Sequence, residues 1–271
     1  MPNLKYNIKP SYNNYRGHLM KVASIQLNIV WESRQENLHR VEKFIQQAKA
    51  DACDLVVLPE MFNSGFSMNC AVVAECPDGL SSQKLSELAK KHHINIIAGL
   101  TEINNNLASN IALMINREGM IKAKYIKNYP FSPVGEDKSY VTGNQQVVFE
   151  IDGVKASVFI CYDLRFPELF RKVAKQVQMI FVIASWPETR QDHWQTLLKA
   201  RAIENQCFIV GVNRIGKDGN GVKYIGGSQV FDPSGVNLSR AGKEQEYLVT
   251  ELDLSKVNKL RQELPFLQDI K

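Results

Sequence analysis

The sequence predicts an α/β protein in which two mixed β-sheets pack face to face and helices cover their outer faces. Up to residue 100, strand-like and helix-like segments alternate in the order β-α-β-α-β, which is typical of a sheet with helical crossovers. Turn signals at 116–119 and 152–153 then separate pairs of apolar segments, which predicts antiparallel hairpins. With 44% hydrophobic residues, the chain can fill a sizeable core.

The first half of the chain supplies three strands and two helices. Leu38, Val41, Ile45 and Ala48 recur at helical spacing and predict a helix over 36–50. The short strand that follows, LVVL, is wholly apolar, which suggests burial on both faces. The other elements predicted here are strands at 21–28, 55–58 and 94–100 and a helix around 85–89.

The second half is richer in strands. Apolar segments bounded by turn residues predict strands at 111–115, 120–126, 147–151, 154–160, 179–184, 207–212, 230–232 and 247–252. Apolar spacing and a proline at a first helical position predict helices over 167–175 and 191–205 and a last short one around 254–260. The segment GKDGNG at 216–221 is expected to be a turn-rich loop.

The chain is expected to form one domain over residues 20–271, because no linker, repeat or low-complexity segment interrupts it. Residues 1–19 are polar and lack the apolar centre of a secretory signal, so we expect a flexible N-terminal extension. No apolar run approaches the roughly 20 residues of a membrane helix, which argues against a membrane span.

Charge and cysteine content narrow the class of protein further. The formal net charge is +5, but basic and acidic residues are interspersed, which gives little support for nucleic-acid binding. The cysteine count is five, an odd number, and no C-x-x-C pair or zinc-like spacing occurs. We therefore expect reduced thiols in a cytoplasmic protein that binds no metal.

One stretch, SVFICYDLRFPE, places a cysteine where chemistry is favoured. The stretch starts with an apolar strand that ends at Cys161, and Pro167 starts the next helix. At such a strand-to-helix turn, backbone N–H groups favour an anion, so the pKa of a thiol can fall and the thiol can become a nucleophile. The alternative is that Cys161 is an inert buried residue.

Two further polar residues also lie at the carboxyl ends of predicted strands. Glu60 closes DLVVLPE, and Lys127 closes the strand that ends in Tyr125-Ile126. Ligands of open α/β sheets bind outside the carboxyl ends of strands. If these groups converge, the thiol can attack a carbonyl, the carboxylate can move the protons and the ammonium can stabilise the oxyanion. The alternative is that Glu60, Lys127 and the similarly ambiguous Glu136 are ordinary surface residues.

A family resemblance supports the first interpretation. Three segments together resemble the nitrilase superfamily of carbon–nitrogen hydrolases, namely LPEMFNSGF (58–66), YIKNYPFSPVGE (125–136) and FICYDLRFPELF (159–170). Two later segments, at 184–216 and 224–235, look like its omega-amidase-like branch. The resemblance covers nearly all of residues 20–271.

The resemblance implies a fold and a set of roles. The fold would be an α-β-β-α sandwich. Glu60 would be the general base, Lys127 the transition-state stabiliser and Cys161 the nucleophile, with the N–H of Tyr162 joining Lys127 around the oxyanion. Glu136 matches a second glutamate that orients groups near the lysine. No metal or organic cofactor is implied.

The resemblance also implies a substrate class, namely small omega-amido dicarboxylates such as 2-oxoglutaramate and 2-oxosuccinamate. Their free carboxylate needs a cationic partner, for which Arg165 is the candidate, although it can equally pair with Asp163 or Glu168. Many members carry His-Leu soon after the lysine, whereas this chain has NYPF at 128–131, so the pocket wall is expected to differ. The aromatic candidates for that wall are Phe62, Phe66, Tyr129, Phe131 and Trp186.

Partners and rival functions stay open at this stage. Members of the superfamily usually pair, so we expect a homodimer or larger homo-oligomer that uses the 167–175 helix and the C-terminal end. The same triad would also serve nitrile hydrolysis or N-carbamoyl cleavage. Two other classes are a non-catalytic metabolite-binding dimer and a redox protein acting through Cys161, the latter disfavoured because no C-x-x-C partner exists.

Overall fold

The protein is an α-β-β-α sandwich built on two six-stranded mixed sheets, in a computed structural model that describes residues 19–270. The first sheet runs in the order β14 (Glu246–Asp253), β1 (Leu19–Gln26), β2 (Leu55–Val57), β3 (Asn95–Asn104), β4 (Leu107–Ile115) and β5 (Ile121–Ile126). The second runs in the order β13 (Asn237–Arg240), β12 (Gln229–Phe231), β9 (Phe208–Asn213), β8 (Met179–Ala184), β7 (Val154–Ile160) and β6 (Val148–Ile151).

Each sheet has a parallel centre and antiparallel edges. Strands β1, β2 and β3 are parallel, as are β7, β8 and β9. The hairpin pairs β4–β5 and β6–β7 are antiparallel, as the turn signals predicted. The pair β3–β4 is also antiparallel, but its turn at 105–106 was not predicted. Because two antiparallel steps separate β5 from β3, β5 points the same way as β2, and their carboxyl ends lie at the same edge of the first sheet.

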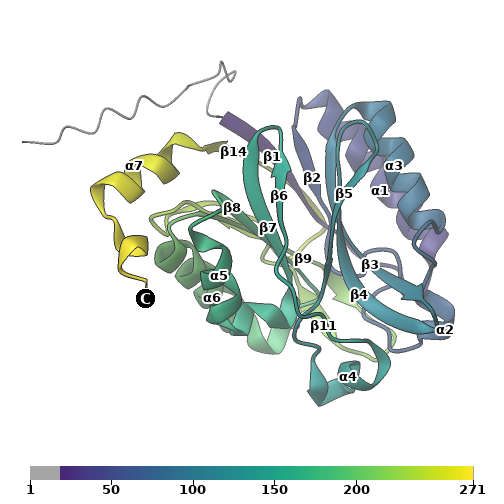
Figure 1. Cartoon of the computed structure of the whole chain (residues 1–271). Helices are drawn as coiled ribbons and strands as arrows, with labels where there is room; N and C mark the ends of the chain where they lie inside the picture. The colour runs from purple at the N-terminus through teal and green to yellow at the C-terminus, as the bar shows by residue number, and fades with distance from the viewer. Residues whose placement is uncertain (1–18, 271) are drawn as a thin grey trace, which may run out of the picture.

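Helices cover the outer face of each sheet (Figure 1). Helices α1 (Arg34–Ala50) and α3 (Leu80–His92) lie on the first sheet, and α5 (Pro167–Ala174) and α6 (Gln191–Asn205) lie on the second. The shorter helices are α2 (Cys70–Val73), α4 (Glu136–Ser139) and α7 (Ser255–Glu263), the last of which lies near the C-terminus. Within residues 19–270, no helix has the length and apolar character needed to cross a membrane.

The alternation of buried side chains along β2 explains its apolar sequence. Leu55 and Val57 join the core between the two sheets, whereas Val56 joins the core under α1 and α3. All three side chains are fully buried, and burial of each aliphatic side chain contributes about 1.5–3 kcal/mol. A strand in the middle of a four-layer sandwich must therefore be apolar on both faces.

Most predicted elements are confirmed, and the differences have local causes. Strand β8 and helix α6 have the predicted bounds. The segment around 216–221 is not only a loop, since it joins the two short strands β10 (Ile215–Lys217) and β11 (Lys223–Ile225). Strand β13 and helix α2 were not predicted, because each has four residues and shows no clear periodicity. Residues 1–18 of the predicted extension lie outside the described residues, and Leu19 already belongs to β1.

Candidate active site

The three candidate catalytic residues each follow a strand. Glu60 comes after β2, Lys127 directly follows β5 and Cys161 directly follows β7. The first two strands belong to one sheet and the third to the other, so the side chains meet where the carboxyl ends of both sheets come together. The structure thus brings the three residues to one site.

Lys127 lies between two buried carboxylates. Its Nζ donates to Glu60 Oε1 at 2.9 Å and to Glu136 Oε1 and Oε2 at 3.0 and 2.8 Å. Side-chain exposure is 1% for the lysine and 0% for both glutamates. Burial on its own lowers the pKa of Lys127, but the carboxylates of Glu136 and Glu60 outweigh it and raise that pKa above its ordinary value. The lysine is therefore a permanent ammonium at neutral pH.

Each carboxylate has further donors. Asn110, on β4, donates through Nδ2 to Glu60 Oε1 at 2.7 Å and to Glu136 Oε1 at 2.9 Å. The backbone N–H of Ser185 donates to Glu60 Oε2 at 2.8 Å. Glu136 is the first residue of α4, and it also accepts from the backbone N–H of Phe131. These hydrogen bonds thus hold both carboxylates in a defined orientation.

The turn that carries Cys161 is sharply bent, and hydrogen bonds to Asp163 hold it in place. Cys161 has φ of +47°, a left-handed conformation that a non-glycine residue adopts only where its surroundings enforce it. Asp163 accepts from the N–H of Ile160 at 2.9 Å, from the hydroxyl of Tyr125 at 2.8 Å and from the N–H of Tyr129 at 2.8 Å. The turn is therefore clamped to the segment that carries Lys127.

The expected lowering of the thiol pKa is wrong for the free protein. Burial and the nearby carboxylate of Glu60 raise the pKa of Cys161 well above its ordinary value, although Lys127 acts in the opposite direction. The 3₁₀ helix that starts at Cys161 spans only five residues, so its N-terminal field is weak against these two effects. Cys161 is therefore a neutral thiol at rest, and a nucleophilic role for it would require a base to take its proton.

Alkylation of Cys161 by iodoacetamide should accordingly be slow at about pH 7 and accelerate beyond about pH 9, because only the thiolate reacts. The rate would be followed by peptide mass mapping, with the urea-unfolded chain as the control. Reaction of the folded protein at neutral pH as fast as that of the unfolded chain would contradict a raised thiol pKa.

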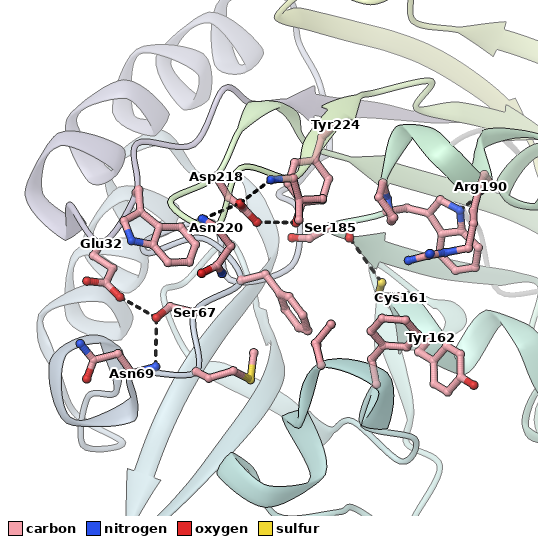
Figure 2. Close-up of a pocket in the computed structure, with 18 of the residues that line it drawn as sticks. Glu32, Ser67, Asn69, Cys161, Tyr162, Ser185, Arg190, Asp218, Asn220 and Tyr224 are labelled. Carbon is pink, nitrogen blue, oxygen red and sulfur yellow. Dashed lines mark hydrogen bonds between the residues drawn. The ribbon is translucent and has the colours of Figure 1, made fainter.

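A cavity of about 550 Å³ opens beside the thiol. Figure 2 shows Cys161, Tyr162 and Arg190 on one side of it and Glu32 with Ser67 on the other. Glu32 accepts a hydrogen bond from the hydroxyl of Ser67 at 2.6 Å, which engages the carboxylate at that end. The volume fits a small molecule of a few carbon atoms and surrounding water.

Two guanidinium groups reach this cavity without a carboxylate partner among residues 19–270. Arg165 lies over the rings of Trp186 and Tyr162, at 4.8 and 5.9 Å from their centroids, and contacts His193. Arg190 lies 5.2 Å from the ring centroid of Phe131. The aromatic faces hold both cations in place while their donors stay available for an anion.

The predicted wall residues divide into two groups. Phe66, Phe131, Trp186 and Arg165 line the cavity, and Arg165 pairs with neither of the acidic residues considered for it. Tyr129 does not line it, because its ring stacks on Phe166 at 3.6 Å between centroids. The prediction that Phe62 belongs to the pocket wall is wrong as well, since this side chain is fully buried in the core under α1 and α3.

Among the residues of the site that sequence reasoning missed are Asn110, Ser185 and Arg190. Ser185 directly follows β8, so the rule that polar residues gather at strand ends applies to it and was not used. Asn110 is a polar residue within the apolar run ASNIALMI, which is itself a signal of a buried function. Arg190, just before α6, shows no local signal.

The chain is similar in sequence to several known proteins. The sequence model of the carbon–nitrogen hydrolase family matches residues 21–262. The chain is 36% identical to a 2-oxoglutaramate amidase of Bacillus subtilis (strain 168), over 92% of this chain and 97% of that one. It is 33% identical to an omega-amidase of Escherichia coli (strain K12), over 92% of this chain and 96% of that one.

A solved structure is similar over almost the whole fold. It is that of XC1258 from Xanthomonas campestris, described as a CN-hydrolase superfamily protein with an arsenic adduct in the active site. The TM-score is 0.89 at 28% identity, with 94% of this chain and 98% of that chain covered.

Proposed function

The chain belongs to the carbon–nitrogen hydrolase family, and we propose that it is an omega-amidase that releases ammonia from a small omega-amido dicarboxylate such as 2-oxoglutaramate or 2-oxosuccinamate. One observation carries the proposal: the cavity beside Cys161 also holds two guanidinium groups, Arg165 and Arg190, that no carboxylate of the described chain neutralises. Such a cavity suits a substrate with an amide at one end and a carboxylate at the other. The names of the two bacterial relatives support it.

Acylation begins with the neutral thiol. Glu60 takes the proton of Cys161 as its sulfur attacks the amide carbon, and the carbonyl oxygen becomes an oxyanion. The ammonium of Lys127 and the backbone N–H of Tyr162 stabilise that oxyanion. The C–N bond then breaks, Glu60 returns the proton to the leaving nitrogen, ammonia departs and a thioester remains on Cys161.

Deacylation repeats these roles with water. Glu60 takes a proton from a water molecule as the water attacks the thioester carbon, and Lys127 and the N–H of Tyr162 again hold the oxyanion. The C–S bond breaks, Cys161 regains its proton and the dicarboxylate is released. Glu136 keeps the ammonium of Lys127 in place through its two hydrogen bonds, without contacting the reacting atoms.

The substrate panel that tests the proposal contains 2-oxoglutaramate, succinamate, butyramide, a short nitrile and an N-carbamoyl amino acid, read by ammonia release. The proposal expects the two carboxylate-bearing amides to have the highest kcat/KM. Rapid turnover of the nitrile or the carbamoyl compound with none of the amides would replace it with the rival reactions. Binding of ligands without turnover of any compound would favour a non-catalytic binding protein.

Replacement of Arg190 by Gln is expected to raise the KM for succinamate about 10- to 100-fold, the range for a lost hydrogen bond between charged groups. Butyramide has no carboxylate, so its kcat/KM should change by no more than about threefold. The matched control is Arg240→Gln, which removes the same charge from an exposed position on β13. An equal loss for both amides would show that Arg190 does not bind the carboxylate.

We extend the proposal to the setting of the enzyme. The hydrolase domain extends from Leu19, the first residue of β1, rather than from the predicted residue 20, and residues 1–18 precede it. The enzyme acts as a homodimer in the cytoplasm through α5 and the C-terminal end. The exposure of Leu264 and Phe266 beyond α7 supports an interface there, and the unpaired state of the described cysteines is compatible with a reducing compartment. Sedimentation of the full chain would test the dimer.

A further inference from the structure

Asn110 occupies a central position in the catalytic cluster that the mechanism above does not use. It lies within β4 and is almost fully buried, at 1% exposure. Its two Nδ2 hydrogens go to different carboxylates, Glu60 at 2.7 Å and Glu136 at 2.9 Å. Its backbone carbonyl accepts the N–H of Lys127 at 2.9 Å. One residue therefore contacts all three charged members of the cluster.

The charges of the cluster explain why a neutral donor is needed. Two buried carboxylates share one ammonium, so the group carries excess negative charge. A second cation would neutralise it, but it would also draw Glu60 into a salt bridge and weaken it as a base. An amide supplies a hydrogen bond to each carboxylate without adding charge. It also cannot take up or lose a proton during the reaction.

We infer that Asn110 is a positioning residue that keeps the Glu60 and Glu136 carboxylates apart, oriented and ionised, so that Glu60 is ready to accept the proton of Cys161. The inference rests on the proposed function for the role of Glu60, but the hydrogen bonds on which it depends do not. Asn110 touches no reacting atom, so its effect is exerted through Glu60.

The pH dependence of this effect involves every ionisable group that faces the pair. Within residues 19–270 these are Lys127, Cys161 and the phenol of Tyr140. Asp163, whose pKa burial raises to about 7, acts on Lys127 rather than on the pair itself. All of them remain in an Asn110 variant. A difference between variant and wild type therefore isolates the contribution of the amide.

The test compares Asn110→Ala, Asn110→Asp and the wild type. Thr101→Val is the matched control, because Thr101 lies directly opposite Asn110 in the β3–β4 register and is equally buried. Asn110→Ala should lower kcat about 10- to 100-fold with little change in KM and shift the acid limb of kcat/KM to higher pH. Asn110→Asp should be worse than Ala at about pH 8, because it adds a third carboxylate to the cluster. Thr101→Val should keep wild-type kinetics.

A second readout does not depend on turnover. If Asn110 keeps the carboxylates ionised, the folded Ala variant binds more protons than the folded wild type, so its stability falls more steeply as pH rises. The ratio of the unfolding equilibrium constant of the Ala variant to that of the wild type should increase about tenfold from about pH 5 to about pH 8, as measured by urea denaturation. A difference that is constant with pH, or an isosteric Asp variant that outperforms Ala at pH 8, would reduce Asn110 to a packing residue.

The two readouts separate the inference from the proposed function. If the wild type hydrolyses no amide, the proposed function fails, and the denaturation comparison still decides whether Asn110 controls the ionisation of the pair. If the wild type is an amidase, but the Asn110 variants match it in kinetics and in the pH dependence of stability, the role of Asn110 fails and the proposed function stands.

Discussion

Replacement of Cys161 by Ser is expected to lower kcat about 10⁴-fold or more, because a serine hydroxyl at this position is a far weaker nucleophile than the thiol. The roles proposed for Glu60 and Lys127 cannot compensate for the lost sulfur. The fold should persist. Within residues 19–270 the thiol makes one long hydrogen bond, at 3.8 Å to the carbonyl of Ser185, so the free energy of unfolding should change by about 1 kcal/mol or less.

The measurement is intact-protein mass after rapid mixing with succinamate, together with kcat from ammonia release. Wild-type protein should show a transient acyl adduct, and the Ser variant should show none. Cys76→Ser is the control, since Cys76 is an exposed thiol remote from the cluster and its loss should leave kcat unchanged. An adduct or substantial turnover in the Cys161 variant would remove the thiol from the mechanism.

The parts of this site that the sequence could predict are those that obey a local rule. Glu60, Lys127 and Cys161 each follow a predicted strand, and such positions lie at the edge where ligands bind. The family resemblance assigned roles to these positions. The prediction needed no knowledge of how the two sheets pack, because every parallel strand end is a candidate site in itself.

Asn110 could not be assigned in this way, because its function depends on pairing. Its side chain reaches Glu60 only because β4 pairs with β3, and β3 pairs with β2 ahead of Glu60. Its other partner, Glu136, comes from the start of α4, after β5. Ser185 depends on contact between the sheets, since it belongs to the second sheet and donates to a glutamate of the first. Neither pairing can be computed from the periodicity of one segment.

The error about the thiol has an electrostatic origin. The sequence showed a cysteine ahead of a helix, and the helix field favours the thiolate. The structure adds burial and the carboxylate of Glu60, and these effects dominate because both disfavour the charged form of the sulfur at low dielectric. The error about Tyr129 also arises from a contact that only the folded chain makes, because its ring stacks on Phe166 and does not line the cavity.

Replacement of Lys127 by Met is expected to damage both stability and activity. The variant leaves two buried carboxylates, Glu60 and Glu136, without their cation, and removal of one partner of a buried ion pair costs about 3–5 kcal/mol. It also removes one of the two proposed oxyanion donors, which should lower kcat at least about 10²- to 10³-fold. The matched control is Lys138→Met on the exposed face of α4, which should change stability by no more than about 0.5 kcal/mol.

The pH dependence distinguishes this cause from a simple packing defect. In the wild type the pKa of Lys127 is raised, so its contribution to stability is fully present below the unfolded pKa of about 10.4 and is lost only as pH rises through the higher folded pKa. It is therefore constant between about pH 5 and pH 8. In the variant the uncompensated carboxylates take up protons in the folded state, which partly relieves their burial at low pH.

The deficit of Lys127→Met relative to the wild type should consequently be larger at about pH 8 than at about pH 5, as measured by urea denaturation at both values. A methionine that merely packs poorly would give the same deficit at both. A deficit that grows as pH falls would mean that the ammonium does not hold two ionised carboxylates, and the assignment of Glu60 as an ionised base would fail with it. Stability and the proposed catalysis would thus depend on the same ammonium, because the charge that lies between the buried carboxylates of Glu60 and Glu136 is the charge proposed to stabilise the oxyanion.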